Sequence, residues 1–267
     1  IVRQAHRGDL NFPTHMSASI RLQQTLGDPD CHLDKVAELV VAEPLVAARL
    51  VAIANSVAFT RFGGKISNVR AAVTQLGLKT LRSVVAAVFL RQVGSAIANP
   101  AIRLRAESLW QHCAEVAALA RVLARELSAV DPETALFAGV VHEIGSFYLL
   151  SRAEEFPVLV EPCGTDEDVA ALGQVSASIL HALKVPKTVV EAVSPLPVVD
   201  SFDSALSLGQ VVALANDLAE IRSPLESPFH PSTLSPGNGI QICGKDVATI
   251  LQPAAAEIAA TRDALLA

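Results

Sequence analysis

The sequence predicts an all-α protein, and three observations lead to this prediction. Of the 267 residues, 51% are hydrophobic but only 4% are aromatic, and most of the apolar ones are Ala, Val and Leu, which suit closely packed helices. Apolar residues recur at intervals of three and four along most of the chain, as on one face of a helix. The alternation of period two that marks a half-buried strand never persists beyond a few residues. This aliphatic content also excludes a mostly disordered chain.

Three helices are predicted in the first half of the chain. The first follows a turn at 28–30 and has one apolar face, formed by Leu33, Val36, Ala37 and Val40. The second begins at Pro44, where the missing N–H costs nothing, and its apolar residues lie nearly all round, so it should be buried. The third runs over about 69–93, with a break expected near Gly77.

Proline and capping residues divide the second half. A long helix is expected over about 102–127, after Asn99-Pro100. Asp131 is expected to cap the next helix, which continues through Ile144. Further helices are predicted at 167–183, 187–193, 204–221 and 246–266, and a loop rich in Pro, Ser and Gly at 223–239.

The charge is distributed unevenly, although the net charge is only −6. Between Glu43 and Glu107 the charged residues are all basic: Arg49, Arg61, Lys65, Arg70, Lys79, Arg82, Arg91, Arg103 and Arg105. We expect this basic segment to pack beside acidic helices of the same chain. A nucleic-acid partner is the disfavoured alternative, because the basic residues are dispersed and no aromatic residues alternate with them to stack on bases.

Neither a membrane span nor a disulfide framework is expected. A bilayer-spanning helix needs about 20 apolar residues, and the strongest apolar run ends at Arg82 and Arg91. The cysteines lie far apart and form no CxxC pair, which indicates reduced, mostly buried thiols: Cys31, Cys113, Cys163 and Cys243. No signal peptide is recognised, so we expect a cytoplasmic protein without membrane insertion. Because the chain begins with Ile1 rather than Met, an upstream segment is also expected.

Short motifs follow one another in a definite order. The first half holds Asp28-Pro29-Asp30, Val36-Ala37-Glu38-Leu39, Glu43-Pro44, Ala54-Asn55-Ser56, Lys65-Ile66-Ser67 and Leu76-Gly77-Leu78. The second half holds Leu109-Trp110-Gln111-His112 and Phe137-Ala138-Gly139-Val140-Val141-His142-Glu143-Ile144-Gly145. From about Phe12 to Ile221 this succession resembles the HDOD domain, a bacterial signalling relative of the HD phosphohydrolases.

The resemblance implies an HD-domain-like helical bundle with an additional N-terminal helical subdomain. The expected division is a flanking segment at 1–11, an N-terminal helical part at 12–99, the HD-like bundle at 100–222, and a loop with a C-terminal helix at 223–267. HDOD proteins are typically cytoplasmic signal-transduction modules, often joined to receiver or cyclic-nucleotide enzyme domains, and most lack demonstrated catalysis.

The resemblance also implies where a metal would be held. HD phosphohydrolases use a His, a His-Asp pair and a later Asp, and these positions correspond here to His112, His142, Glu143 and Asn216. Compared with Asp, Glu adds one methylene and Asn removes a negative charge, so this ligand set is weakened for a divalent ion. We therefore expect no metal, and interpret the histidines as a core pair hydrogen-bonded across two helices. The alternative is a surviving site for Fe, Mn, Zn or Mg.

Asn55 and Ser56 form a second candidate site at the end of a buried helix. Polar side chains at such a position commonly bond the free backbone groups of the helix end, which is the interpretation we favour. The alternative is that they form an edge of a binding surface with Arg61, Lys65 and Arg70.

Two functions from different classes follow from these observations. The expected one is a non-catalytic signalling or scaffold module that binds signalling proteins through exposed helix faces, with a nucleotide second messenger as a further partner. The alternative is a metal-dependent HD-type phosphohydrolase or phosphodiesterase acting on a nucleotide or cyclic dinucleotide.

Overall fold

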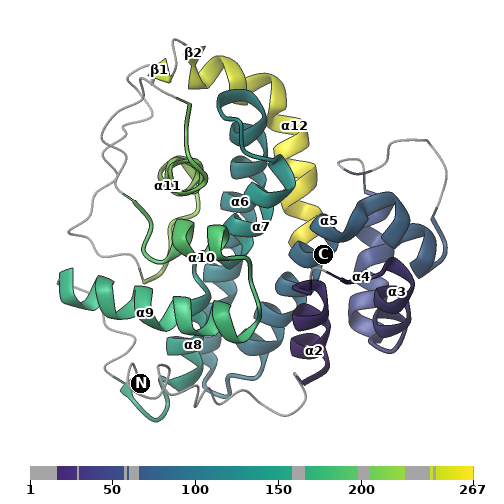
Figure 1. The fold of residues 1–267 in the computed structure, drawn as a ribbon. Helices are drawn as coiled ribbons and strands as arrows, with labels where there is room; N and C mark the ends of the chain where they lie inside the picture. The colour runs from purple at the N-terminus through teal and green to yellow at the C-terminus, as the bar shows by residue number, and fades with distance from the viewer. Residues whose placement is uncertain are drawn as a thin grey trace.

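A computed structural model describes residues 17–28, 30–56, 59, 66–157, 166–197, 205–225, 241–242 and 245–266. Its regular structure is almost entirely helical (Figure 1), which confirms the predicted all-α class. Within the described residues, the exceptions are β1 (Gln241–Ile242) and β2 (Lys245–Asp246), two short strands that pair antiparallel. This ribbon precedes the last helix and was not predicted.

The N-terminal helices lie at the right of Figure 1 and pack on one long helix. They are α2 (Ser17–Leu26), α3 (Leu33–Val41), α4 (Pro44–Ala54) and α5 (Val69–Ser95). The break predicted near Gly77 is confirmed, because this residue has φ 75° and ψ 169° inside α5. A positive φ is readily adopted only by glycine. The chain therefore changes direction here, between the part of α5 near α3 and α4 and the part inside the bundle.

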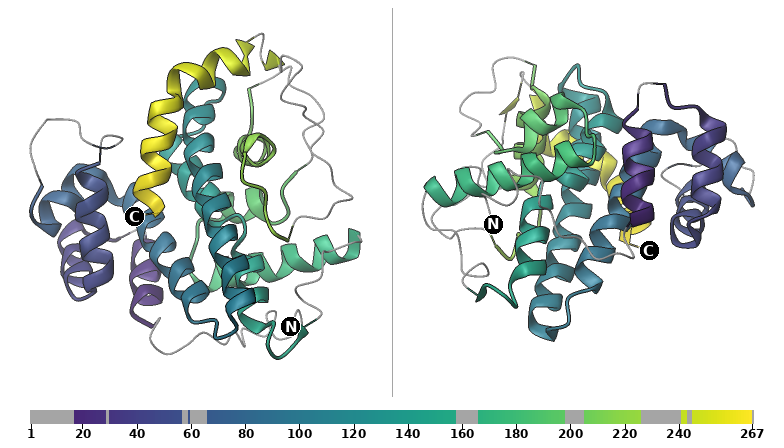
Figure 2. Two further views of the ribbon diagram at one scale, coloured as in Figure 1. Left: turned by 180° about the vertical axis from the view of Figure 1, so that it is seen from behind. Right: turned by 60° about the horizontal axis from the view of Figure 1, so that its bottom comes forward.

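The rest of the molecule is a bundle around α6. Its helices are α6 (Pro100–Leu127), α7 (Pro132–Val141), α8 (Ile144–Arg152), α9 (Asp166–Ala182), α10 (Lys187–Val193), α11 (Leu208–Leu218) and α12 (Val247–Leu266). Helices α5, α7, α8, α11 and α12 all contact α6, and Figure 2 shows from behind how α12 lies along it. The predicted caps are present: the Asn99 side chain accepts from the first turn of α6, and Asp131 accepts from Thr134 N at 2.9 Å.

One predicted helix is interrupted. The pattern predicted a single helix from Pro132 through Ile144, but α7 ends at Val141 and α8 begins at Ile144. His142 and Glu143 form the turn between them. Both flanking helices are buried on several faces, so apolar residues continue across the turn. The apolar pattern therefore does not reveal where α7 ends and α8 begins.

The basic segment has different partners from those expected. Arginines from it donate to carbonyls at the C-terminal ends of helices, where the helix dipole favours cations: Arg82 Nε to Leu26 O at 2.8 Å, Arg49 Nη1 to Leu265 O at 3.0 Å, and Arg91 Nη1 to Leu266 O at 2.6 Å. Acidic partners occur too, since Arg70 pairs with Asp34 and Lys79 with Asp131. Carbonyls at helix ends therefore bind several arginines of the basic segment, for which the sequence predicted acidic helices as partners.

Two segments are long and apolar enough to cross a membrane by length and composition alone, namely Val69–Ser95 and Pro132–Arg152. In their most apolar windows, 61% and 78% of the residues are buried inside the protein. The second segment is also interrupted by the turn at His142. Both are core helices of this fold, and core helices commonly pass such a test.

An ion pair joins α6 to its neighbours. Arg121 Nε donates to Glu133 Oε1 at 2.8 Å, Thr80 of α5 donates to the other carboxylate oxygen, and the guanidinium lies 4.4 Å from the ring centre of Phe59. The Arg121 side chain is only 11% exposed. Removing one partner of a poorly solvated pair leaves the other charge without compensation.

Replacing Arg121 by methionine is expected to lower the free energy of unfolding by about 2 kcal/mol. Urea unfolding would measure this loss. Arg121→Met combined with Glu133→Gln should cost less than the sum of the two single changes, because each removes the same pair. Arg262→Met is the control, since Arg262 pairs with Asp263 near the surface and should change stability by under about 1 kcal/mol. Additive losses in the double variant would contradict this account.

Candidate functional site

The two predicted histidines meet in the centre of the bundle. His112 lies in the middle of α6 and is fully buried, and His142, in the turn after α7, is 6% exposed. Their Nε2 atoms are 3.3 Å apart, and the ring planes are tilted by 55°. The close approach of α6 and α7 brings them together.

Backbone carbonyls fix the tautomer of both neutral rings. His112 Nδ1 lies 2.6 Å from Ile221 O, and His142 Nδ1 lies 2.8 Å from Gly139 O. A carbonyl oxygen can only accept a hydrogen bond, so each Nδ1 carries the proton when the ring is neutral. Each neutral ring then has its lone pair on Nε2, and the two lone pairs face each other. The predicted direct hydrogen bond between the rings would therefore require one of them to be charged.

Glu143 and Asn216 complete the predicted set. One ligand atom each from His112, His142 and Glu143 lie within 4.8 Å of one another, so the longer glutamate side chain still reaches the pair. The other side of the carboxylate is used by Ser146, whose hydroxyl donates to it. The Asn216 side chain is a hydrogen-bond partner of His142. The structure thus brings all four residues together.

The spacing of the two imidazoles fits one divalent ion. Two nitrogens bound to a tetrahedral metal at about 2.1 Å lie about 3.4 Å apart, close to the 3.3 Å between the Nε2 atoms. Metal-ligating histidines usually donate their other N–H to a carbonyl or carboxylate, as both do here. Imidazole and carboxylate together suit ions such as Zn²⁺ or Fe²⁺. The expectation that no metal binds remains a prediction, and the geometry does not favour it.

Burial strongly disfavours the charged form of His142. Its pKa is lowered to about 4, mainly because burial removes water from the ring, while the charge of Glu143 opposes the shift and His112 adds to it. The hydrogen bonds to Gly139 and Asn216 also oppose it. At neutral pH the ring is therefore uncharged, which is the form that binds a metal.

Stability should fall as the pH decreases from 6.5 to 4. In this window the unfolded chain protonates His142 while the folded chain does not, so the free energy of unfolding decreases by up to about 3 kcal/mol. Urea unfolding across this range should show a shallower pH slope for His142→Gln than for the unchanged protein. The exposed His181 provides the control, and His181→Gln should keep the full slope. Equal slopes in all three proteins would refute the assignment.

Sequence reasoning missed Glu115, which supports His112. This residue is 6% exposed and accepts from Glu220 N at 3.1 Å and from Ile221 N at 2.9 Å. It thereby holds the two peptides that precede the Ile221 carbonyl, the group that orients the His112 ring. The spacing of three residues on α6, which places Glu115 and His112 on one face, could have indicated this role.

Two cysteines are described, and both are free thiols, as predicted for them. Cys113 is buried next to Glu143, and its pKa lies well above the ordinary value because burial disfavours the thiolate. It is therefore a packed neutral side chain rather than a further ligand. Cys163 and Cys243 lie outside the described residues.

The second candidate site is only partly described. Asn55 Nδ2 donates to Val51 O at 2.8 Å and Ile66 O at 2.7 Å, and its Oδ1 accepts from Ile66 N. Ser56 donates to Ile53 O at 2.8 Å. These bonds agree with the interpretation that both side chains bind free backbone groups. Arg61 and Lys65 lie outside the described residues, so the binding surface that would include them and Arg70 remains a prediction.

A small cavity of about 130 Å³ opens beside the histidine pair. Its polar side chains are those of His142, Glu143 and Ser176. The other described residues that line it are apolar or glycine: Val169, Leu172, Gly173, Val193, Pro195 and Leu196. No described Lys or Arg lines it. Next to the cavity, a Cβ at Gly145 would collide with Ser176 and Leu172. Helices α8 and α9 are therefore closely packed at this point.

An all-helical bundle with a histidine on one helix, and a histidine and carboxylate in the turn after the next helix, defines the HD-like class. Within this class the chain belongs to the HDOD domain family, whose family model matches residues 12–193. The match covers the N-terminal helices and the histidine pair, and it ends before α11 and Asn216. The recognised resemblance is thereby confirmed.

Solved structures share this fold. A protein from Shewanella amazonensis SB2B, provisionally named a metal-dependent phosphohydrolase, is 22% identical with a TM-score of 0.62, over 99% of this chain and 94% of that one. An HDOD domain protein of unknown function from Geobacter sulfurreducens is 20% identical with a TM-score of 0.63, over 99% and 97%. A protein from Marinobacter aquaeolei VT8, provisionally named a signal transduction protein, is 17% identical with a TM-score of 0.60, over 98% and 59%. No curated protein is significantly similar in sequence.

Proposed function

We propose that this chain is a non-catalytic signalling module that acts in the cytoplasm by binding other signalling proteins. The observation that carries the proposal is the cavity beside the histidine pair. At about 130 Å³ it is well below the roughly 300–1,000 Å³ of pockets that enclose ligands. No described Lys or Arg side chain lines it, whereas phosphoryl transfer depends on positive groups that stabilise the developing charge.

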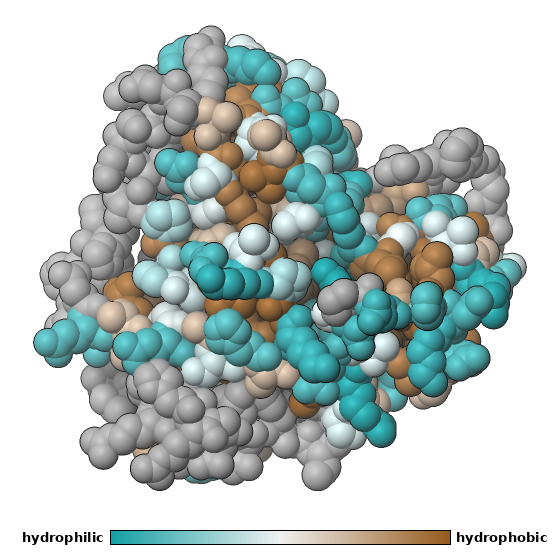
Figure 3. All heavy atoms as spheres, in the orientation of Figure 1, coloured by the Kyte–Doolittle hydropathy of each residue, from teal (hydrophilic) through white to brown (hydrophobic). Residues whose placement is uncertain are grey.

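Exposed apolar residues support protein binding through helix faces. Leu33 and Val41, at the two ends of α3, are 45% and 63% exposed. Figure 3 shows hydrophobic residues at the surface over the N-terminal helices at the right of the view. A partner protein that covers such exposed apolar side chains removes them from water. We infer that α3 contributes to the partner surface.

A second candidate function is favoured by the spacing of the ligand atoms. His112, His142 and Glu143 would hold a single ion, and Asn216 would lie beside it. Such an ion would polarise a bound water or a phosphate oxygen. The resulting activity would be a metal-dependent phosphohydrolase, the activity in the provisional name of the Shewanella protein.

The two functions separate in one experiment. The purified chain, loaded in turn with Fe²⁺, Mn²⁺ and Zn²⁺, is tested on a panel of nucleotides and cyclic dinucleotides, with His142→Ala as the reference. We expect no turnover above that of His142→Ala, even when an ion is bound. Turnover that requires both His142 and the metal would replace the proposed function with the second candidate.

A cellular test addresses partner binding directly. In the native host, a chromosomal deletion is complemented with the unchanged gene, with His142→Ala, or with Leu33→Glu combined with Val41→Glu. The proposal expects His142→Ala to complement and the double variant not to. Lys187→Glu, an exposed change on α10, is the matched surface control and should complement. Complementation by the double variant would remove α3 from the partner surface.

A further inference from the structure

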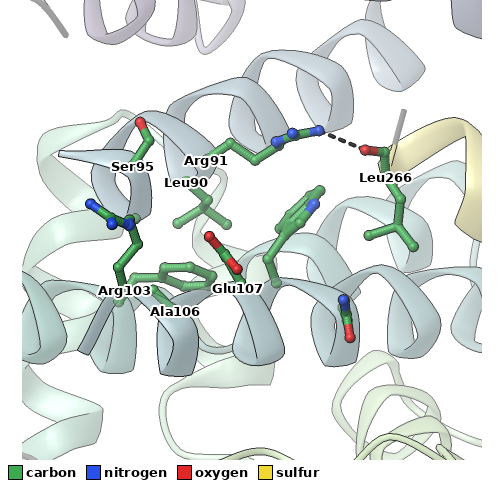
Figure 4. Close-up of a pocket in the computed structure, with 11 residues that line it drawn as sticks. Leu90, Arg91, Ser95, Arg103, Ala106, Glu107 and Leu266 are labelled. Carbon is green, nitrogen blue, oxygen red and sulfur yellow. Dashed lines mark hydrogen bonds between the residues drawn. The ribbon is translucent and has the colours of Figure 1, made fainter. Parts of the chain in front are cut away.

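A second cavity lies against the face of α6 that is turned away from His112. It has a volume of about 330 Å³ and is lined by parts of α5, α6, α8 and the end of α12 (Figure 4). This volume is at the lower end of the range for small-molecule sites, about 300–1,000 Å³. None of the residues matched to the metal motif lines it.

The inner walls of this cavity are apolar. Leu90, Ala106 and Phe147 are at most 2% exposed and come from three different helices. Trp110 also lines the cavity and is 6% exposed, yet its indole Nε1 is buried and has no hydrogen-bond partner among the described residues. A buried N–H donor without an acceptor costs free energy. Because the Nε1 atom itself is buried, Trp110 lines the cavity through its ring carbons.

Charges of both signs surround the opening. Figure 4 shows the Glu107 carboxylate directed from α6 into the space below α5, with the guanidinium groups of Arg103 and Arg91 to either side. Arg91 Nη1 already donates to Leu266 O at 2.6 Å and Arg103 Nη1 to Ile97 O at 3.3 Å, which leaves further N–H groups on each. Within the described residues, the Glu107 carboxylate has no hydrogen bond or ion pair.

We propose that this cavity binds a small zwitterion with an apolar side group, the chemistry of a free hydrophobic amino acid. The ligand carboxylate accepts from an arginine guanidinium, and the ammonium group donates to Glu107. The apolar side group packs on Leu90, Ala106 and Phe147. A purely anionic ligand such as a nucleotide fits less well, because its phosphate would be repelled by Glu107 at the same opening.

This site is independent of the function proposed above. Ligand binding here requires neither a metal nor a partner protein, so either proposal can fail without the other. The site also contacts α12, because Arg91 bonds the last described carbonyl of that helix. A ligand that accepts a hydrogen bond from Arg91 would weaken the hydrogen bond between Arg91 and Leu266 O at the end of α12.

The protein contains its own reporter of this cavity. Trp110 is the single tryptophan of the sequence, so intrinsic tryptophan emission reports on this place in the molecule. The experiment titrates the full chain with L-leucine, with isoamylamine, which lacks the carboxylate, and with 4-methylpentanoate, which lacks the ammonium group. L-leucine should change the tryptophan emission in a saturable way, and each analogue should bind at least about tenfold more weakly than L-leucine.

Variants test the assigned contacts. Glu107→Gln keeps the side-chain size nearly unchanged, whereas Arg103→Gln shortens the side chain and removes its charge. Each change should weaken L-leucine binding at least about tenfold. Glu38→Gln, an exposed change on α3, should bind as the unchanged protein does. Thermal unfolding of each variant verifies that it is folded, so that weaker binding is not mistaken for unfolding.

Three results would overturn the proposal. The first is no saturable change with any hydrophobic amino acid up to about 10 mM, a concentration above the millimolar dissociation constants of weak sites. The second is equal binding of 4-methylpentanoate and L-leucine, which would indicate a simple anion site. The third is saturable binding of GMP or AMP in place of L-leucine, which would indicate a nucleotide site.

Discussion

Replacing Gly139 by alanine is expected to lower the free energy of unfolding by about 4 kcal/mol. A Cβ at this position would lie 2.5 Å from Ala117 Cα and 2.9 Å from Ala117 N. Overpacking usually costs about 1–3 kcal/mol, and the cost is higher here because backbone atoms of α6 cannot rotate away. Chemical and thermal unfolding measure the loss, and the midpoint temperature should fall by roughly 10 °C.

Gly94→Ala provides the matched control for this change. Its added Cβ would lie 3.3 Å from the Ala106 Cβ and 3.9 Å from a Phe147 ring carbon. Alanine is favoured over glycine in a helix by up to about 1 kcal/mol, which offsets this modest crowding. A loss of less than about 1 kcal/mol for Gly139→Ala would show that α6 and α7 separate easily, and so would undermine the fixed spacing of the histidine pair.

Replacing Glu115 by alanine should also cost about 4 kcal/mol. The change leaves the N–H groups of Glu220 and Ile221 without their acceptor, at about 1–3 kcal/mol each. Urea unfolding tests the stability. Metal affinity gives an independent readout, because the freed segment no longer holds the Ile221 carbonyl against His112. Losing such a support typically weakens metal binding 10- to 100-fold.

Glu126→Ala is the control on the same helix. Its carboxylate pairs with Arg125 near the surface, with the Glu126 side chain 40% exposed, so the loss should be under about 1 kcal/mol. If Glu115→Ala proved no more costly than Glu126→Ala, the two backbone hydrogen bonds would have little weight in holding the segment after α11.

Much of the fold could be predicted because the chain marks its own helix ends. Asn99 and Asp131 precede Pro100 and Pro132, and a capping residue followed by proline starts a helix through local interactions alone. The Gly77 break was predictable for the same reason. The turn at His142 was not, because it accompanies a change of main packing partner, from α6 for α7 to α9 for α8, which leaves no local mark in the sequence.

The residues of the candidate site could be predicted from the sequence, but the tautomers of its two histidines could not. The motif spacing identified His112 and His142, yet the facing lone pairs depend on Ile221 O and Gly139 O, which only the folded chain brings to the rings. Backbone partners of this kind have no sequence signal. The cavity at Trp110 was likewise hidden, since its walls come from segments far apart in the chain.

The position of α12 has a consequence for biosynthesis. This helix is the last described segment, yet its end is held by Arg49 and Arg91, residues translated about two hundred positions earlier. While the ribosome makes the intervening chain, those guanidinium groups lack their native acceptors and the flank of α6 stays uncovered. Contacts so distant in sequence form slowly, and nascent chains with uncovered apolar surface are prone to aggregate. Chaperone demand during translation should therefore end only once α12 has emerged.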